Sequence, residues 1–223
     1  MKLEGLKINF LGDSITEGVK VSCKENIYPY ILKRNVGLSE VRNYGIGGTT
    51  VAFQKGTDIR PKNDYTDVNS FCERFDKMDD DADMVVVFGG TNDYGHGSAA
   101  LGTPGDRTKE TFWGACHTLY SSLIEKFPEA TIVVLTPFHR CNEDNLRGDG
   151  SKPCDVAPLK TNVDIIRSVA EYYSLPGLDL YASSGIQPNV PVLKEKYMPD
   201  GLHPNDAGYE KLASKIIRFL ENL

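Results

Sequence analysis

The sequence has no apolar run long enough to cross a membrane. The longest apolar runs, such as residues 84–88, are far shorter than the about 20 apolar residues that a transmembrane helix needs. The N-terminus also lacks the apolar core of a secretory signal, so we expect a cytoplasmic protein. Positive charge is scarce: 25 Lys and Arg stand against 31 Asp and Glu, for a formal net charge of -6. Without a positive field to attract phosphate groups, neither nucleic acid nor a membrane is an expected partner.

Motifs of disulfide and metal chemistry are missing too. The 5 cysteines are an odd number without a CxxC pair, which favours reduced thiols over a disulfide framework or a zinc knuckle. Cys141 and Cys154 flank a polar loop, and the sequence leaves open whether they ever pair. The 4 histidines are scattered without HExxH spacing, so we expect no metal site.

What the sequence does contain is a series of short apolar runs separated by helical stretches. Its length of 223 residues, with 40% hydrophobic residues, suits one globular domain that covers residues 1–223. Short apolar runs are typical of strands that helices cover on both faces. The predicted strands are 8–11, 41–44, 84–88, 132–135 and the weaker 178–181, and the predicted helices are 28–36, 108–127, 159–174 and 206–220. This alternation predicts an α/β fold, a three-layer α/β/α sandwich with a flavodoxin-like five-stranded parallel sheet.

Functional residues are expected where the predicted strands end, because ligands of open α/β sheets bind beyond the carboxyl ends of the strands. Gly12-Asp13-Ser14 follows the first predicted strand, a glycine-rich stretch that contains Gly48 follows the second, and Gly89-Gly90-Thr91-Asn92 follows the third. Three aperiodic segments, 53–66, 94–107 and 139–158, are long enough to form functional rims.

Ser14 lies on a predicted strand-to-helix turn, and serine there has two interpretations. It can cap the helix N-terminus, or it can be a nucleophile whose hydroxyl is exposed above the sheet. A nucleophilic serine needs a histidine base and a carboxylate that orients it. Asp200 and His203 supply both within three residues, just before the last predicted helix. Together they predict a Ser14, His203 and Asp200 triad.

The remaining histidines leave alternatives open. His139 follows the fourth predicted strand, so it is a second candidate for the base or a possible substrate contact. His96, in a loop rich in Gly and Ser, is a candidate for lining a pocket. Asp13 and Arg140 are further candidates for substrate binding.

Attack on an ester carbonyl creates an oxyanion, which needs prepositioned hydrogen-bond donors. The backbone N–H groups of Ser14 and Gly48 and the side-chain amide of Asn92 are candidate donors. Each also has a plain structural alternative. Gly48 can serve a turn that needs positive φ, and Asn92 can cap the following segment.

These stretches together resemble the four blocks of the SGNH hydrolases, the GDSL esterase and lipase family. Gly12-Asp13-Ser14-Ile15 is similar to the first block, with Ile in place of the family's Leu. Gly48, Asn92 and the pair Asp200 with His203 match the second, third and last blocks in the right order. The resemblance implies a flavodoxin-like sandwich, a serine acyl-enzyme mechanism without a cofactor, and an oxyanion hole formed by Ser14, Gly48 and Asn92.

The expected activity is hydrolysis of a small-molecule ester. The presumed rim loops, 55–67 and 140–155, are strongly polar, which favours short acyl groups on a polar alcohol, such as an acetylated carbohydrate, over lipids. Acyl transfer with the same residues, or lipase or thioesterase activity, remains an alternative. A more distant one is a nucleotide- or phosphate-binding module built on the glycine-rich stretch at Gly48, although neither G-x-G-x-x-G nor a Walker lysine is present. The oligomeric state is left open.

Overall fold

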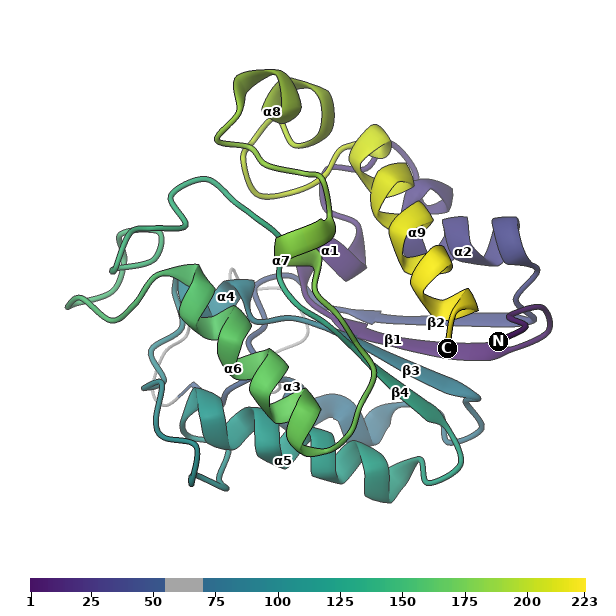
Figure 1. The fold of residues 1–223 in the computed structure, drawn as a ribbon, viewed down its shortest axis with the longest axis horizontal. Helices are drawn as coiled ribbons and strands as arrows, with labels where there is room; N and C mark the ends of the chain where they lie inside the picture. The colour runs from purple at the N-terminus through teal and green to yellow at the C-terminus, as the bar shows by residue number, and fades with distance from the viewer. Residues whose placement is uncertain (55–69) are drawn as a thin grey trace.

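A five-stranded parallel sheet forms the centre of the molecule. The structure is a computed structural model that describes residues 1–54 and 70–223. The strand order is β2-β1-β3-β4-β5, and each neighbouring pair is parallel (Figure 1). The strands are β1 (Lys7–Gly12), β2 (Glu40–Gly45), β3 (Met84–Phe88), β4 (Thr131–Leu135) and β5 (Gly177–Leu178). The predicted flavodoxin-like α/β sandwich is therefore confirmed.

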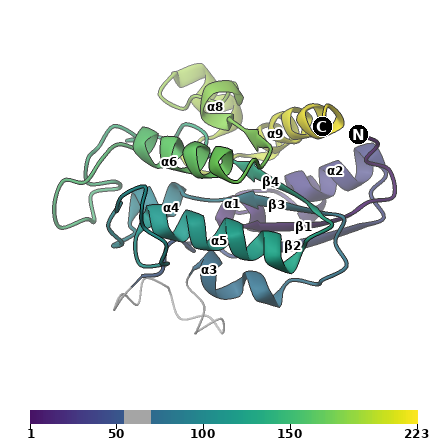
Figure 2. The same cartoon turned by 60° about the horizontal axis from the view of Figure 1, so that its bottom comes forward.

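Helices cover both faces of the sheet (Figures 1 and 2). On one face, α2 (Tyr28–Val36) and α9 (Asp206–Glu221) pack against Phe10 and Val86. On the other face, α3 (Phe71–Arg74), α5 (Phe112–Lys126) and α6 (Leu159–Tyr172) pack against Val85 and Val87. Successive residues of β3 thus enter opposite cores, which explains why its sequence reads as one unbroken apolar run.

Two elements have different bounds in the structure from those that the sequence predicts. The helix predicted from residue 108 begins at Phe112, because Thr111 caps it by accepting a hydrogen bond from Gly114 N–H at 3.2 Å. The strand predicted over 178–181 is wrong beyond Leu178. The Asp179 carboxylate accepts a hydrogen bond from Ala182 N–H at 3.0 Å, which starts the helix α7 (Leu180–Ser183) instead.

Short helices begin at the carboxyl edge of the sheet. They are α1 (Ser14–Glu17) after β1 and α4 (Thr91–Gly95) after β3. The segment before α9 holds α8 (Pro191–Tyr197), and the 3₁₀ turns are η1 (Lys24–Asn26) and η2 (Phe75–Lys77). Of the predicted rim segments, 94–107 and 139–158 are described, whereas 55–66 of the first and all of the loop 55–67 lie outside the described residues.

The described helices are all too short or too polar to pass through a lipid bilayer.

Candidate active site

Ser14 is the first residue of α1, directly above the end of β1. Its side chain does not cap this helix, because the Asp13 carboxylate accepts the Ile15 N–H at 3.0 Å and fills that role. The Ser14 hydroxyl is instead 3.0 Å from Nε2 of His203. With 8% of its surface exposed, Ser14 is mostly shielded from solvent. The capping interpretation of Ser14 is therefore wrong, and its hydroxyl is left for another role.

His203 and Asp200 share a tight turn just before α9. Nδ1 of His203 is 2.9 Å from the Asp200 carboxylate, which also accepts the N–H groups of Leu202 and His203. An ionised carboxylate can only accept a hydrogen bond, so Nδ1 must carry the hydrogen and donate it. Nε2 is then free to accept from the Ser14 hydroxyl. Burial acts to raise the pKa of Asp200, but the hydrogen bonds from His203 and Leu202 outweigh it and hold that pKa below its usual value.

Gly48 lies at the top of a turn that follows β2. Thr49 N–H donates to the Ile46 carbonyl at 3.3 Å, and Gly48 has a φ of 76°, a conformation that favours glycine. A Cβ added to Gly48 would meet nothing within 4 Å. Glycine is thus required by backbone conformation and not by crowding. Within the described part of the chain, the Gly48 N–H donates to no other group.

Asn92 lies within α4 and faces the same turn. Its side-chain amide donates to the Thr49 carbonyl at 2.9 Å. The residue is 5% exposed, and Gly90 occupies the N-cap position of the helix, so the capping interpretation of Asn92 is wrong. An amide nitrogen carries two hydrogens, and one of them remains available after the bond to Thr49.

Residues that the sequence motifs did not single out hold these loops in place. The guanidinium of Arg74, on α3, donates to the carbonyls of Gly12 and Tyr44 and to the Thr49 hydroxyl. It thereby ties the ends of β1 and β2 to the Gly48 turn. Asp93 accepts the N–H groups of Val51 and Ala52 at 2.9 Å each. No local pattern marks Arg74, because its partners are 25 to 62 positions away in the sequence.

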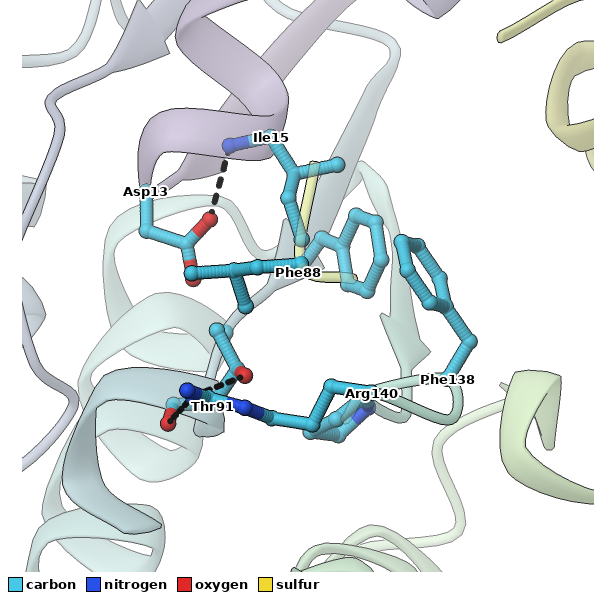
Figure 3. A pocket seen from close by; sticks show the side chains of 9 residues that line it. Asp13, Ile15, Phe88, Thr91, Phe138 and Arg140 are labelled. Atoms are coloured by element: carbon cyan, nitrogen blue, oxygen red, sulfur yellow. Dashed lines mark hydrogen bonds between the residues drawn. The ribbon is translucent and has the colours of Figure 1, made fainter. Parts of the chain in front are cut away.

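Asp13 and Arg140 lie beside the site and face a small pocket (Figure 3). They are 2% and 8% exposed, and Arg140 donates to the carbonyl and hydroxyl of Thr91. Burial raises the pKa of Asp13 to about 7, although the Ile15 N–H and the charge of Arg74 oppose the shift. Asp13 caps α1 and Arg140 binds the first residue of α4, and a contact with substrate stays a prediction for both.

His139 is not positioned to act as the base for Ser14. Its Nδ1 is 2.9 Å from both carboxylate oxygens of Glu143, and its ring packs against Tyr181 at 3.9 Å between centroids. Gln187 and Asn189 also donate to Glu143, at 3.4 and 3.3 Å. This cluster connects the loop after β4 to the segment before α8. The ring nitrogen that meets Ser14 belongs to His203 and not to His139.

Groups that could hold a metal ion are not found among residues 1–54 and 70–223. Cys141 and Cys154 are both free thiols, and Cys154 is exposed. His96 contacts the carbonyl of Gly48 through Nε2 at 3.2 Å. Six of the predicted positions therefore form two groups, whereas Asp13, His139 and Arg140 have other partners. Ser14, His203 and Asp200 form one hydrogen-bonded chain, and Gly48, Asn92 and His96 form an adjacent one around the Gly48 turn.

A hydroxyl, an imidazole and a carboxylate in series above a parallel sheet define the class of α/β serine hydrolases. Comparisons with known proteins specify the family. The model of the GDSL-like lipase/acylhydrolase family matches residues 10–211, and the chain belongs to this family, whose members are carboxylic ester hydrolases.

Solved structures share the fold over the whole chain. One crystal structure is 32% identical with a TM-score of 0.85, over 100% of this chain and 99% of the other. A lipase/acylhydrolase from Enterococcus faecalis is 24% identical with a TM-score of 0.66, over 97% and 96% of the two chains. A two-domain esterase active on acetylated mannans is 22% identical with a TM-score of 0.60, over 98% of this chain and 49% of that one. No curated protein sequence matches the chain significantly.

Proposed function

We propose that the protein, as a single domain, hydrolyses short-acyl esters of polar alcohols through an acyl-enzyme on Ser14. The observation that carries this proposal is the 3.0 Å contact between the Ser14 hydroxyl and Nε2 of His203. Asp200 holds the opposite ring nitrogen at 2.9 Å, so the ring is oriented for proton transfer.

The reaction proceeds in two halves. His203 Nε2 takes the Ser14 proton as the oxygen forms a bond to the acyl carbon, and then returns that proton to the departing alcohol. Water next attacks the acyl-enzyme with the same base, which releases the acid and restores the Ser14 hydroxyl. In both halves the oxyanion accepts hydrogen bonds from the N–H groups of Ser14 and Gly48 and from the Asn92 amide.

Labelling with a fluorophosphonate tests this proposal directly. The wild-type protein is expected to gain the mass of one phosphonyl group, and peptide mapping is expected to find it on Ser14. Intact-mass spectrometry measures the first result and tandem spectrometry the second. Modification of another residue, or no modification at all in a protein that hydrolyses p-nitrophenyl acetate, contradicts the assignment.

The Asn92→Ala variant tests the oxyanion donors. Removing one such donor is expected to lower kcat by about 10²- to 10³-fold with little change in KM, because the oxyanion exists only in the transition state. Steady-state kinetics with p-nitrophenyl acetate measure the effect. Asn222→Ala, at the exposed end of α9, is the matched control and should leave kcat unchanged. A loss confined to KM in Asn92→Ala would place this residue outside the oxyanion hole.

The polar rim supports a short acyl group. The exposed carboxylate of Asp149 lies 3.8 Å from the ring of His96, which contacts the Gly48 turn, and a structural neighbour acts on acetylated mannans. We therefore expect kcat/KM to fall along a series of p-nitrophenyl esters from acetate to octanoate. A higher kcat/KM for octanoate than for acetate would point to lipase or thioesterase activity instead.

Acyl transfer to an acceptor other than water is the second candidate, since it uses the same residues. An alcohol acceptor added at increasing concentration separates the two activities. A hydrolase continues to release free acid, whereas a transferase releases little once its acceptor is saturating.

A further inference from the structure

The Gly48 N–H belongs to a peptide group that lies between two anchored ones. On one side, the Gly47 N–H donates to the Glu17 carboxylate at 2.7 Å. On the other side, the Gly48 carbonyl is 3.2 Å from Nε2 of His96. The peptide group between these two anchors carries the Gly48 N–H. Its direction is thus set by side chains that do not themselves touch the oxyanion.

His96 must be the donor in its contact with Gly48. A carbonyl oxygen has no hydrogen to give, so Nε2 of His96 carries one, in the neutral ring or in the imidazolium. The carboxylate of Asp149 is 3.8 Å from Nδ1 on the other side of the ring. This distance is beyond hydrogen-bond range, so the contact with Gly48 is the hydrogen bond that the His96 ring makes.

Helix α4 and its C-cap residue supply the two side-chain contacts to the carbonyls of the Gly48 turn. Asn92, within α4, binds the Thr49 carbonyl, and His96, the C-cap residue, binds the Gly48 carbonyl. The His96 N–H donates to the Asn92 carbonyl at 3.0 Å, so the two residues are held in a fixed relation. The same short element therefore offers an oxyanion donor and orients the neighbouring one.

We infer that His96 is a positioning residue that holds the Gly48 N–H in line with the oxyanion. Glycine has the widest backbone freedom of any residue, and Gly48 stands at a φ of 76° with open space around it. The same peptide is also held through the Thr49 N–H, which donates to the Ile46 carbonyl at a longer 3.3 Å, so loss of the bond to the Gly48 carbonyl weakens one of two restraints and lets the Gly48 N–H turn from the reacting oxygen. This role rests on the proposed function, and it replaces the expectation that His96 contacts substrate.

Paired variants at His96 test the role. His96→Phe keeps a planar ring but removes the donor, and we expect kcat to fall about 10- to 30-fold, because misaligning a donor costs less than deleting it. KM should stay near the wild-type value, since the contact is not with substrate. His96→Gln restores an N–H close to the position of Nε2 and is expected to recover most of kcat.

The measurements are kcat and KM for p-nitrophenyl acetate, with the thermal unfolding midpoint of each variant. Only 23% of the His96 side chain is exposed, so the larger ring of Phe could be too big for the site. The His96→Ala variant therefore repeats the test without a ring. Three results overturn the inference: an unchanged kcat in both donor-free variants, a rise in KM alone, or an equal loss in His96→Gln. If the proposed function itself is wrong, Ser14 of the wild-type protein stays unlabelled by the fluorophosphonate, and this result distinguishes the two outcomes.

Discussion

Replacement of Ser14 by alanine is expected to lower kcat for p-nitrophenyl acetate by about 10⁴-fold or more, and to abolish fluorophosphonate labelling. Only the oxygen that forms the acyl bond is removed. The oxyanion donors at Gly48 and Asn92 remain, so a small residual rate above that of water is expected.

The fold should tolerate this change, because Asp13 and not Ser14 caps α1. The thermal unfolding midpoint of Ser14→Ala is therefore expected to stay near the wild-type value, which separates a lost nucleophile from a lost structure. Ser168→Ala, on the exposed side of α6, is the matched control, since its hydroxyl only bonds back to the Asp164 carbonyl. Labelling that persists in Ser14→Ala would falsify the assignment of the nucleophile.

The fold was predictable wherever burial alone determines an element. The β3 run is buried at every position, because β1 and β4 flank it within the sheet and helices cover both of its faces. An apolar run of that length has few other stable environments, so its predicted bounds agree with the structure. The last strand was harder to predict. Its apolar letters continue through Tyr181, but the carboxylate of Asp179 starts a helix there, and one hydrogen bond outweighs the pattern.

The candidate site was predictable where the chemistry needs a particular side chain within a short motif. Ser14 and the pair Asp200 with His203 were predicted in this way. Supporting residues were not, because their roles depend on contacts between distant segments. Glu17 lies in the same motif as Ser14, yet its bond to the Gly47 N–H spans 30 residues. His96 was noticed as a loop histidine, but only the folded chain brings its ring to the Gly48 carbonyl.

The choice between His139 and His203 as the base shows the same limit. His139 follows β4 at the carboxyl edge of the sheet, so its position alone did not exclude it, and the sequence favoured His203 only because Asp200 lies three residues before it. Their carboxylate partners separate them in three dimensions. Glu143 binds Nδ1 of His139, and Asp200 binds Nδ1 of His203, but only His203 has Ser14 at its other nitrogen.

Alanine at His203 is accordingly expected to lower kcat about 10⁴-fold, whereas alanine at His139 should leave the rate of acylation close to that of the wild type. Without the imidazole, the Ser14 proton has no acceptor within hydrogen-bond reach among the described residues, and the hydroxyl remains a poor nucleophile. Pre-steady-state release of p-nitrophenol measures acylation, and the rate of fluorophosphonate labelling gives a second, independent measure.

The two variants form a matched pair, because each removes a ring whose Nδ1 is bound to a carboxylate 2.9 Å away. Each removes one hydrogen bond from that carboxylate and leaves the others, from Gln187 and Asn189 to Glu143 and from two backbone N–H groups to Asp200, so the general effect of losing the ring is present in both. His139→Ala also loses the packing against Tyr181 and is expected to show the larger drop in unfolding midpoint. A loss of labelling in His139→Ala, with labelling kept in His203→Ala, would reverse the assignment of the base. A loss in both would mean that the cluster around Glu143 shapes the site on which Ser14 depends.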